Sequence, residues 1–155
     1  ALLIGINEYP ELDDAKKLYG SVADVDLIRQ FLVTKLRVPE AHISTLLNKD
    51  ATHDHIISSI MDLALDSTIE KDDPILIFYA GHGGTLPKPP RWNANSSEIQ
   101  CLVAYDAGYN DVKGMWVKGV VPDVVLTSLL DTLSKVKGNN ITVILDCCHS
   151  GSGTR

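Results

Sequence analysis

Two apolar runs, each ending abruptly in polar and glycine residues, are the feature that most constrains the fold of this chain. The first, residues 74–80, leads to a histidine between glycines, His82, and the second, residues 141–145, leads to Asp146 and two adjacent cysteines. Apolar, β-branched runs of this length are typical of strands buried on both faces of a sheet. In open parallel sheets, the carboxyl ends of the strands form the crevice where ligands bind. The two runs therefore predict that an imidazole and a thiol meet at one edge of one sheet.

Strand-like and helix-like segments alternate through most of the remaining chain. Further strands are predicted at residues 1–6, 42–47 and 101–105. Amphipathic helices are predicted between them, with Thr52 or Asp54 as the N-cap of the second and Asp123 as the N-cap of the third. A proline-containing surface loop is predicted at residues 85–97, and a glycine-containing loop around residues 113–119. The alternation is typical of right-handed crossovers, so we expect one α/β domain with a mainly parallel sheet.

Composition limits the classes of partner and compartment. A chain of 155 residues that is 45% hydrophobic can form one domain with a sizeable core, and its first residues already read as a core strand of a longer protein. No apolar run approaches the roughly 20 residues that a membrane helix needs. A net charge of -6 disfavours nucleic acid and anionic membranes as partners and favours a cationic substrate. Three cysteines, two of them adjacent, do not make a disulfide framework and indicate a reducing compartment, the cytoplasm or nucleus.

Nucleophilic catalysis is the chemistry that the two strand ends favour. A thiol attacks a carbonyl carbon as the thiolate, and because a free cysteine has a pKa near ~8.5, a nearby histidine is the usual activator. His82 is the candidate activator, and the amide of Gly83 is a candidate donor to the developing oxyanion. If the second strand stays extended to its end, Asp146 and Cys148 point to one side and Cys147 to the other. Cys148 is therefore the predicted nucleophile, and Cys147 is predicted to pack under the covering helices.

Asp146 lies beside the predicted nucleophile, and its carboxylate can bind a cationic side chain through charge-assisted hydrogen bonds. This placement predicts a pocket for Arg or Lys next to the reacting carbonyl. The alternative for Asp146 is a structural role, in which it accepts hydrogen bonds from loop amides.

The motifs FYAGHGG (residues 78–84) and ILDCCHSGS (residues 144–152), preceded by ALLIGIN and LYGSVADV, resemble those of a metacaspase large subunit. Metacaspases are caspase-like cysteine peptidases of fungi, plants and protozoa. The resemblance covers essentially the whole chain, residues 1–155, and favours the fungal type. It implies a caspase-like three-layer αβα sandwich and a cysteine endopeptidase that cleaves after Arg or Lys through a dyad of His82 and Cys148. The small-subunit segment of the same protein would lie outside this chain.

The same resemblance implies further site residues. Asp24 would be the second carboxylate of the Arg or Lys pocket, although from the residues alone it reads equally well as a helix N-cap. Ala80 stands at a substrate-contacting position where members often have serine, so one polar contact would be missing. Many members need calcium, and the matching region here offers Glu98 and Asp123, while Arg155 stands about where a later aspartate would fall. A hard cation wants several oxygen ligands, so a sparse set implies weak binding.

Self-processing is predicted after Arg155, a basic residue on a Gly/Ser-rich tail, with Lys113 and Lys118 as alternative cuts in a loop. A cysteine phosphatase is rejected, because that chemistry needs five residues between cysteine and arginine, and Cys148 and Arg155 are separated by six (155 - 148 - 1). The serious alternative is a caspase-like domain that no longer cleaves and acts as a scaffold or regulator.

Overall fold

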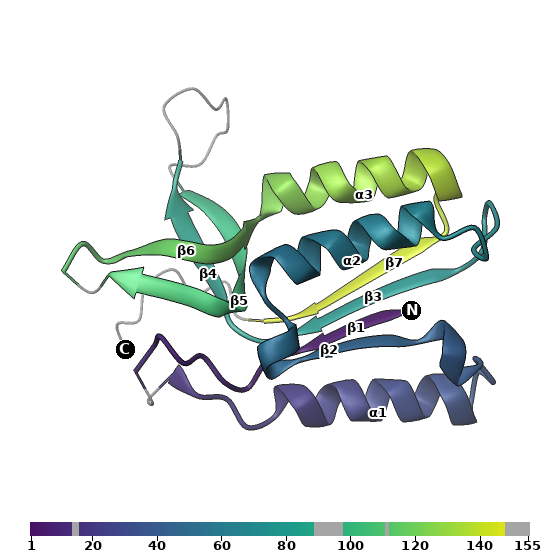
Figure 1. The fold of residues 1–155 in the computed structure, drawn as a ribbon, viewed down its shortest axis with the longest axis horizontal. Helices are drawn as coiled ribbons and strands as arrows, with labels where there is room; N and C mark the ends of the chain where they lie inside the picture. Colours follow the sequence, from purple (N-terminus) through teal and green to yellow (C-terminus); the bar gives the residue numbers. More distant parts are fainter. Residues whose placement is uncertain (14–15, 89–97, 111, 148–155) are drawn as a thin grey trace.

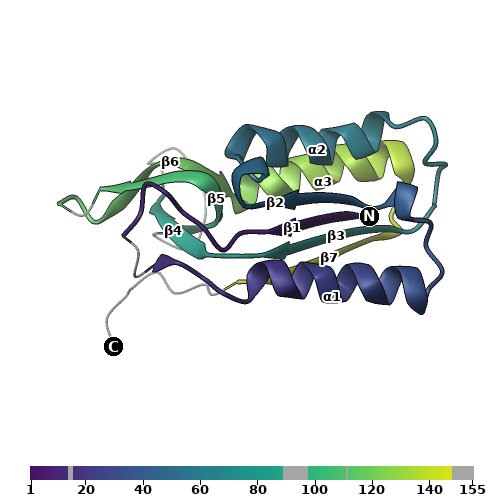
Figure 2. The same cartoon turned by 60° about the horizontal axis from the view of Figure 1, so that its bottom comes forward.

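The computed structural model describes residues 1–13, 16–88, 98–110 and 112–147. Its centre is a four-stranded parallel sheet in the order β2-β1-β3-β7, made of β1 (Leu2–Gly5), β2 (Ser44–Leu47), β3 (Ile75–Ala80) and β7 (Ile141–Asp146). Helix α1 (Ser21–Thr34) covers one face of this sheet, and α2 (His53–Leu65) and α3 (Asp123–Lys137) cover the other (Figures 1 and 2). The predicted three-layer αβα arrangement with a parallel sheet is confirmed.

Strands β1 and β3 lie in the middle of the sheet and are covered on both faces, as their unbroken apolar sequences predict. Leu3 and Phe78 pair across the two strands and pack into the core beneath α1. Leu2 and Ile77, the neighbouring pair, pack into the larger core beneath α2 and α3. Because side chains alternate along a strand, each apolar run supplies both cores at once.

The order of the strands creates a switch point between β1 and β3. The chain leaves β1, forms α1 on one face and returns as β2, and it then crosses by α2 on the other face to β3. The loops after β1 and β3 therefore leave their carboxyl ends in opposite directions. Crevices at such points are where open α/β sheets bind ligands.

A second, antiparallel sheet lies beyond the carboxyl ends of the parallel strands (Figure 1). It has the order β4-β5-β6, formed by β4 (Gly83–Pro87), β5 (Glu98–Asn110) and β6 (Met115–Pro122). The predictions of loops from residue 85 and around residues 113–119 are wrong where β4 and β6 form. Both segments contain proline or glycine, which usually interrupt strands. Here these residues stand where a strand tolerates them, because Pro87 is the last residue of β4 and Gly119 lies where the register between β5 and β6 shifts.

Strand β7 is an edge strand, so the prediction that it is buried on both faces is wrong. Ile144 is 42% exposed and Leu145 is 39% exposed. Within the described ranges, β3 is the one strand that pairs with β7. An apolar run indicates that a strand favours burial, but full burial also requires a paired strand on each side.

Helix starts follow the predictions in part. Thr52 is the N-cap of α2, where its hydroxyl accepts from the amide of His55 at 3.3 Å, and Asp106 accepts from the amide of His53 at 2.8 Å. Asp123 is not the N-cap of α3, because Pro122 occupies that position and Asp123 is the first helical residue. No helix in the described part of the chain has the length and apolar character to span a bilayer.

Gly119 and Gly114 provide a matched test of the second sheet. Both have positive φ, +66° and +62°. A Cβ on Gly119 would overlap the backbone of Ala107 and Asp106, whereas among the described residues a Cβ on Gly114 would meet only Tyr109 Oη within 4 Å, at 3.9 Å. Gly114→Ala should lower the free energy of unfolding by roughly 1–2 kcal/mol through the left-handed conformation alone. Gly119→Ala adds overpacking, about 1–3 kcal/mol more. Denaturant unfolding of both variants checks this, and equal losses would contradict the predicted overlap.

Candidate active site

His82 lies just past the carboxyl end of β3, at the switch point of the parallel sheet. Its amide donates to the hydroxyl of Tyr9 at 2.8 Å, and its carbonyl accepts from the hydroxyl of Tyr79 at 2.7 Å. The amide of Val103 on β5 also donates to this carbonyl, at 3.0 Å. The backbone of His82 is therefore tied to β3, to β5 and to the loop after β1.

The imidazole of His82 is oriented by a backbone carbonyl. Its Nε2 lies 2.5 Å from the carbonyl oxygen of Lys16. A carbonyl oxygen only accepts hydrogen bonds, so Nε2 must carry the proton in this contact. In the neutral ring, Nδ1 is then left as the base. This tautomer suits a general base that takes a proton from a thiol.

Asp146 and Asp24 lie on the same side of the parallel sheet. Along β7, Ile141, Val143 and Cys147 pack against the core beneath α2 and α3, so the alternating Asp146 belongs to the α1 face. Asp24 is half-buried in the first turn of α1, which covers that face near the carboxyl end of the sheet. The structure thus directs both carboxylates to the α1 side of the strand ends.

The described residues give neither carboxylate a structural role. Within the described residues, the side chains of Asp24 and Asp146 make no hydrogen bond or ion pair. Asp24 is not the N-cap of α1, since Gly20 holds that position, and Asp146 contacts the loop through its backbone carbonyl, which accepts from the amide of Gly81 at 3.2 Å. Both negative charges are open to a cationic ligand.

Ala80 and Gly83, the candidate residues before and after the histidine, have different surroundings. Ala80 is buried with Val25 and Phe78 beneath α1, so its methyl group belongs to the core and is not a surface for substrate. Gly83 follows His82 directly and begins β4, opposite Leu102 of β5. Gly83 remains the candidate oxyanion donor because it is the residue next to the base.

The two described cysteines pack as predicted, and Cys148 lies outside the described residues. Cys147 is half-buried against the core beneath α2 and α3. Cys101 is buried within β5, and burial raises the pKa of its thiol to about 11. Neither thiol is therefore a rival to Cys148 as the nucleophile.

A sequence model described as the caspase domain matches residues 1–155. The chain belongs to the caspase domain family. Metacaspase-7 of Arabidopsis thaliana is 28% identical over 154 residues, covering 97% of this chain and 34% of the relative. Metacaspase-1 of Lodderomyces elongisporus is 29% identical over 161 residues (98% and 33%), and Metacaspase-3 of Trypanosoma cruzi is 30% identical over 162 residues (98% and 40%). Plant, fungal and trypanosomal relatives match about equally, so they do not favour the predicted fungal type.

The fold of this caspase domain also matches a solved structure. Protein GSU0716 from Geobacter sulfurreducens has a TM-score of 0.67 and 23% identity, with 97% of this chain and 50% of that chain covered. At this identity the likeness shows the fold alone. The caspase domain described here spans about a third of the length of the first curated relatives that it matches.

The predicted calcium ligands of the caspase domain do not form a site with the residues that the structure describes. Glu98 opens β5 and Asp123 opens α3, and both are exposed. No group of three or more His, Cys, Asp or Glu side chains in the described ranges could hold a metal ion. Calcium takes six to eight oxygen ligands, and the described acidic side chains of this region do not supply such a set by themselves. Arg155, at the position expected for a later ligand, lies outside the described residues.

The predicted processing sites differ in their surroundings. Lys118 lies within β6, not in a loop, and its ammonium pairs with Glu11 at 2.6 Å. Cutting there would require unpairing the strand from β5. Lys113 lies in the exposed turn between β5 and β6, and Arg155 lies outside the described residues.

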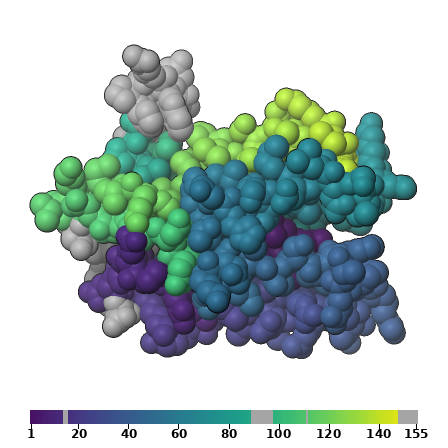
Figure 3. Space-filling view, viewed as in Figure 1, coloured from purple at the N-terminus to yellow at the C-terminus, as the bar shows by residue number. Residues whose placement is uncertain are grey.

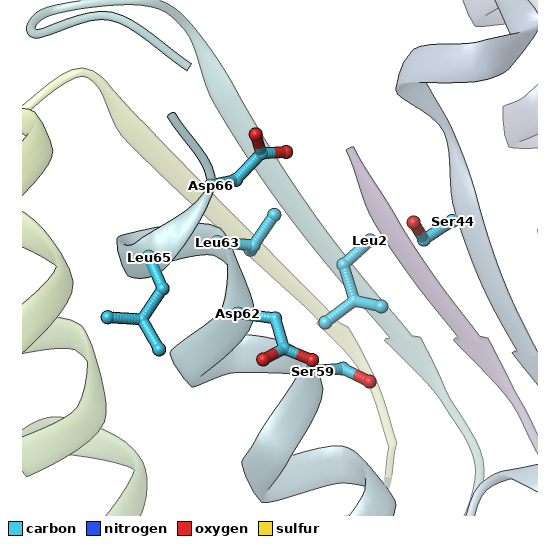
Figure 4. Close-up of a pocket in the computed structure, with 7 residues that line it drawn as sticks. All are labelled: Leu2, Ser44, Ser59, Asp62, Leu63, Leu65 and Asp66. Atoms are coloured by element: carbon cyan, nitrogen blue, oxygen red, sulfur yellow. The ribbon is translucent and has the colours of Figure 1, made fainter. Parts of the chain in front are cut away.

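One hollow among the described residues lies at the opposite end of the parallel sheet from His82. It has a volume of about 420 Å³ and is lined by residues of β1, β2 and α2, among them Leu2, Ser44 and Asp62 (Figure 4). In Figure 3 the purple start of the chain lies at its floor, between α2 and the segment that carries β2. These are the amino ends of the strands, whereas His82 lies at the carboxyl ends.

Sequence reasoning missed Tyr9, Tyr79 and the carbonyl of Lys16, all of which contact His82. Tyr79 stands three residues before His82, in the strand itself, and was read only as an apolar residue. Tyr9 and Lys16 lie in the loop after β1, and no local pattern links them to a histidine more than sixty residues later.

Cys101 gives a test of burial within β5. A thiol with a pKa of about 11 is about a thousandth thiolate at pH 8, against about a quarter for a free cysteine with a pKa near ~8.5. Alkylation of Cys101 by iodoacetamide at pH 8 should therefore be at least about a hundred times slower in folded than in guanidinium-unfolded protein. The rate should rise as the pH approaches 11. Peptide mass spectrometry measures it, and equal rates in the two states would contradict the burial of Cys101.

Proposed function

We propose that this caspase domain is the catalytic part of a cysteine endopeptidase in which His82 activates Cys148. The single observation that carries the proposal is the orientation of the His82 imidazole: Nε2 is bound to the carbonyl of Lys16, which leaves Nδ1 as the base. The base follows β3, and Cys148 follows the adjacent strand β7 by two residues in the sequence. Family membership supports the same chemistry.

The reaction follows from these groups. Nδ1 of His82 takes the thiol proton of Cys148, and the sulfur forms a bond to the carbonyl carbon of the substrate peptide. The amides of Gly83 and Cys148 donate to the oxyanion of the tetrahedral intermediate. The amide nitrogen then leaves with the proton from His82, and a thioester remains. Water activated by His82 hydrolyses the thioester and restores the thiol.

The substrate preference that we propose is for Arg or Lys before the cut. Asp24 and Asp146 support it, because both carboxylates lie on the α1 side of the strand ends and neither is engaged by the described residues. A guanidinium or ammonium group between them would form charge-assisted hydrogen bonds. The net charge of -6 would also attract cationic peptides.

The partner that we propose is a further segment of the same protein, corresponding to the small subunit. The outer edge of β7, where Ile144 and Leu145 are exposed, supports an added strand. Leu27 and Phe31 of helix α1 are further exposed apolar side chains, one turn apart. The curated relatives are about three times as long as this chain, which leaves room for such a segment.

Calcium stimulation, self-processing after Arg155 or Lys113, and a reducing compartment remain predictions. The region of Glu98 and Asp123 does not support the first, since the described residues there make no cation site.

The activity is tested with the complete protein and fluorogenic peptides ending in Arg, Lys or Asp, each with and without calcium. We expect cleavage after Arg and Lys, and a loss of kcat of at least about a thousandfold in Cys148→Ala and His82→Ala, since a nucleophile and its base act as a unit. Intact-mass analysis of the same proteins reports processing, which should be absent in Cys148→Ala. Cleavage that persists in Cys148→Ala would reject Cys148 as the nucleophile, and no cleavage by folded protein would reject the peptidase in favour of a non-cleaving scaffold.

The acidic pocket is tested by Asp24→Asn and Asp146→Asn, with Asp26→Asn as the matched control. Asp26 lies on the same helix as Asp24 but is exposed. A hydrogen bond to a charged group is worth about 1.5–3 kcal/mol, so each pocket variant should lower kcat/KM for Arg peptides by at least about tenfold. Asp26→Asn should change it little. Equal effects of all three substitutions would show that overall charge, and not a pocket, attracts the substrate.

A further inference from the structure

Two buried tyrosine hydroxyls hold both polar groups of the His82 backbone. Tyr9 accepts the amide hydrogen of His82 at 2.8 Å, and the Tyr79 hydroxyl lies 2.7 Å from the His82 carbonyl oxygen. Tyr9 is 6% exposed and Tyr79 is fully buried. The two residues come from different elements, Tyr79 from β3 and Tyr9 from the loop after β1.

Tyr9 contacts the reactive ring as well as the backbone. Its ring centroid lies 4.8 Å from that of the His82 imidazole, with the planes tilted by 43°. The Lys16 carbonyl holds Nε2 of the same imidazole. Tyr9 and Lys16 both belong to the segment between β1 and α1, so this segment fixes the ring from two directions.

Both phenols stay neutral throughout the physiological pH range. Burial raises the pKa of Tyr9 to about 12, against the smaller opposing effect of the hydrogen bond from the His82 amide. Burial also raises the pKa of Tyr79 well above its ordinary value. Tyr79 therefore keeps the proton that it donates, and its hydroxyl lies close to the carbonyls of both His82 and Val103, at 2.7 and 2.8 Å.

Gly81 is needed to make room for this pair of hydroxyls. A Cβ at Gly81 would lie 2.6 Å from Tyr79 Oη and 2.9 Å from Tyr9 Oη. Gly81 does not have a positive φ. A glycine is therefore needed here because a side chain would not fit, and not because of the backbone conformation. The glycine before the histidine thus makes room for the two tyrosine hydroxyls.

We propose that Tyr9 and Tyr79 are positioning residues that clamp His82 in the orientation that leaves Nδ1 as the base. The inference rests on the proposed peptidase function and adds two residues to its machinery. The hydrogen bonds of both tyrosine hydroxyls to His82 are made to its backbone and not to a ring nitrogen. Each acts through the backbone of His82, and Tyr9 acts through the ring as well.

The two tyrosines should contribute unequally. The His82 carbonyl keeps the Val103 amide as a second donor, at 3.0 Å, when the Tyr79 hydroxyl is removed. In the described part of the chain, the Tyr9 hydroxyl is the acceptor of the His82 amide, so its removal leaves that donor unpaired. Tyr9→Phe should therefore impair catalysis more than Tyr79→Phe.

The test uses the complete protein carrying Tyr9→Phe, Tyr79→Phe or, as the control, Tyr109→Phe. Tyr109 packs edge-on against Trp116 and lies seven residues along β5 from Leu102, the residue that pairs with Gly83. Because small misplacements of a catalytic group cost up to about a hundredfold in rate, Tyr9→Phe should lower kcat for an Arg peptide by about tenfold to a hundredfold with KM unchanged. Tyr79→Phe should lower kcat less, and Tyr109→Phe should leave it unchanged. Thermal unfolding verifies that each variant is folded.

A second readout needs no turnover: the rate of Cys148 alkylation by iodoacetamide across pH, followed by mass spectrometry. A well-placed imidazole makes the thiol reactive at lower pH than a free cysteine, so Tyr9→Phe should move the profile to higher pH. A folded Tyr9→Phe protein with the wild-type kcat and alkylation profile would overturn the inference alone. Wild-type Cys148 that reacts like a free thiol, without cleavage, would overturn the proposed function and the inference with it. Should Tyr9→Phe not fold, an unchanged kcat in folded Tyr79→Phe would overturn the clamp.

Discussion

The pairing of β1 with β3 between two helical layers is the constraint on which the rest of the structure depends. The two strands are covered on both faces, and their paired side chains supply the core beneath α1 and the core beneath α2 and α3 together. Because the chain turns one way after β1 and the other way after β3, the loops separate at their carboxyl ends. The Tyr9 loop leaves from one strand and His82 from the other, so the site depends on this pairing.

Features that depend on local pattern were predictable from the sequence. The run at residues 74–80 predicted a buried strand with His82 at its end, and strand alternation predicted that Cys147 packs under the helices. Pairing partners were not predictable, because they lie far apart in the chain. The burial of β7, the strands β4 and β6, and the contact between Tyr9 and His82 each depend on such a distant partner. Asp123 failed as a cap because Pro122 already takes the cap position.

Carboxylates in this chain serve different purposes according to what surrounds them. Asp106 ties β5 to the amino end of α2, and two hydrogen bonds from Thr68 lower the pKa of Asp66 beyond the end of α2. Asp24 and Asp146 have no such partners within the described residues. An unpaired surface carboxylate is common, so openness alone would carry little weight. Their shared side of the sheet, at the end where His82 lies, is what makes them a candidate pocket.

The groups that orient His82 are all electrically neutral. A carboxylate against Nε2 would fix the tautomer and also stabilise the imidazolium, whereas the carbonyl of Lys16 fixes the tautomer without a full charge. The Tyr9 and Tyr79 hydroxyls likewise hold the backbone without charge, because burial keeps both phenols protonated. In such a site the ability of His82 to act as the base depends mainly on the orientation of its ring. Catalysis should then depend on the packing of the loop after β1, which links the chemistry at the end of β3 to the paired strand beside it.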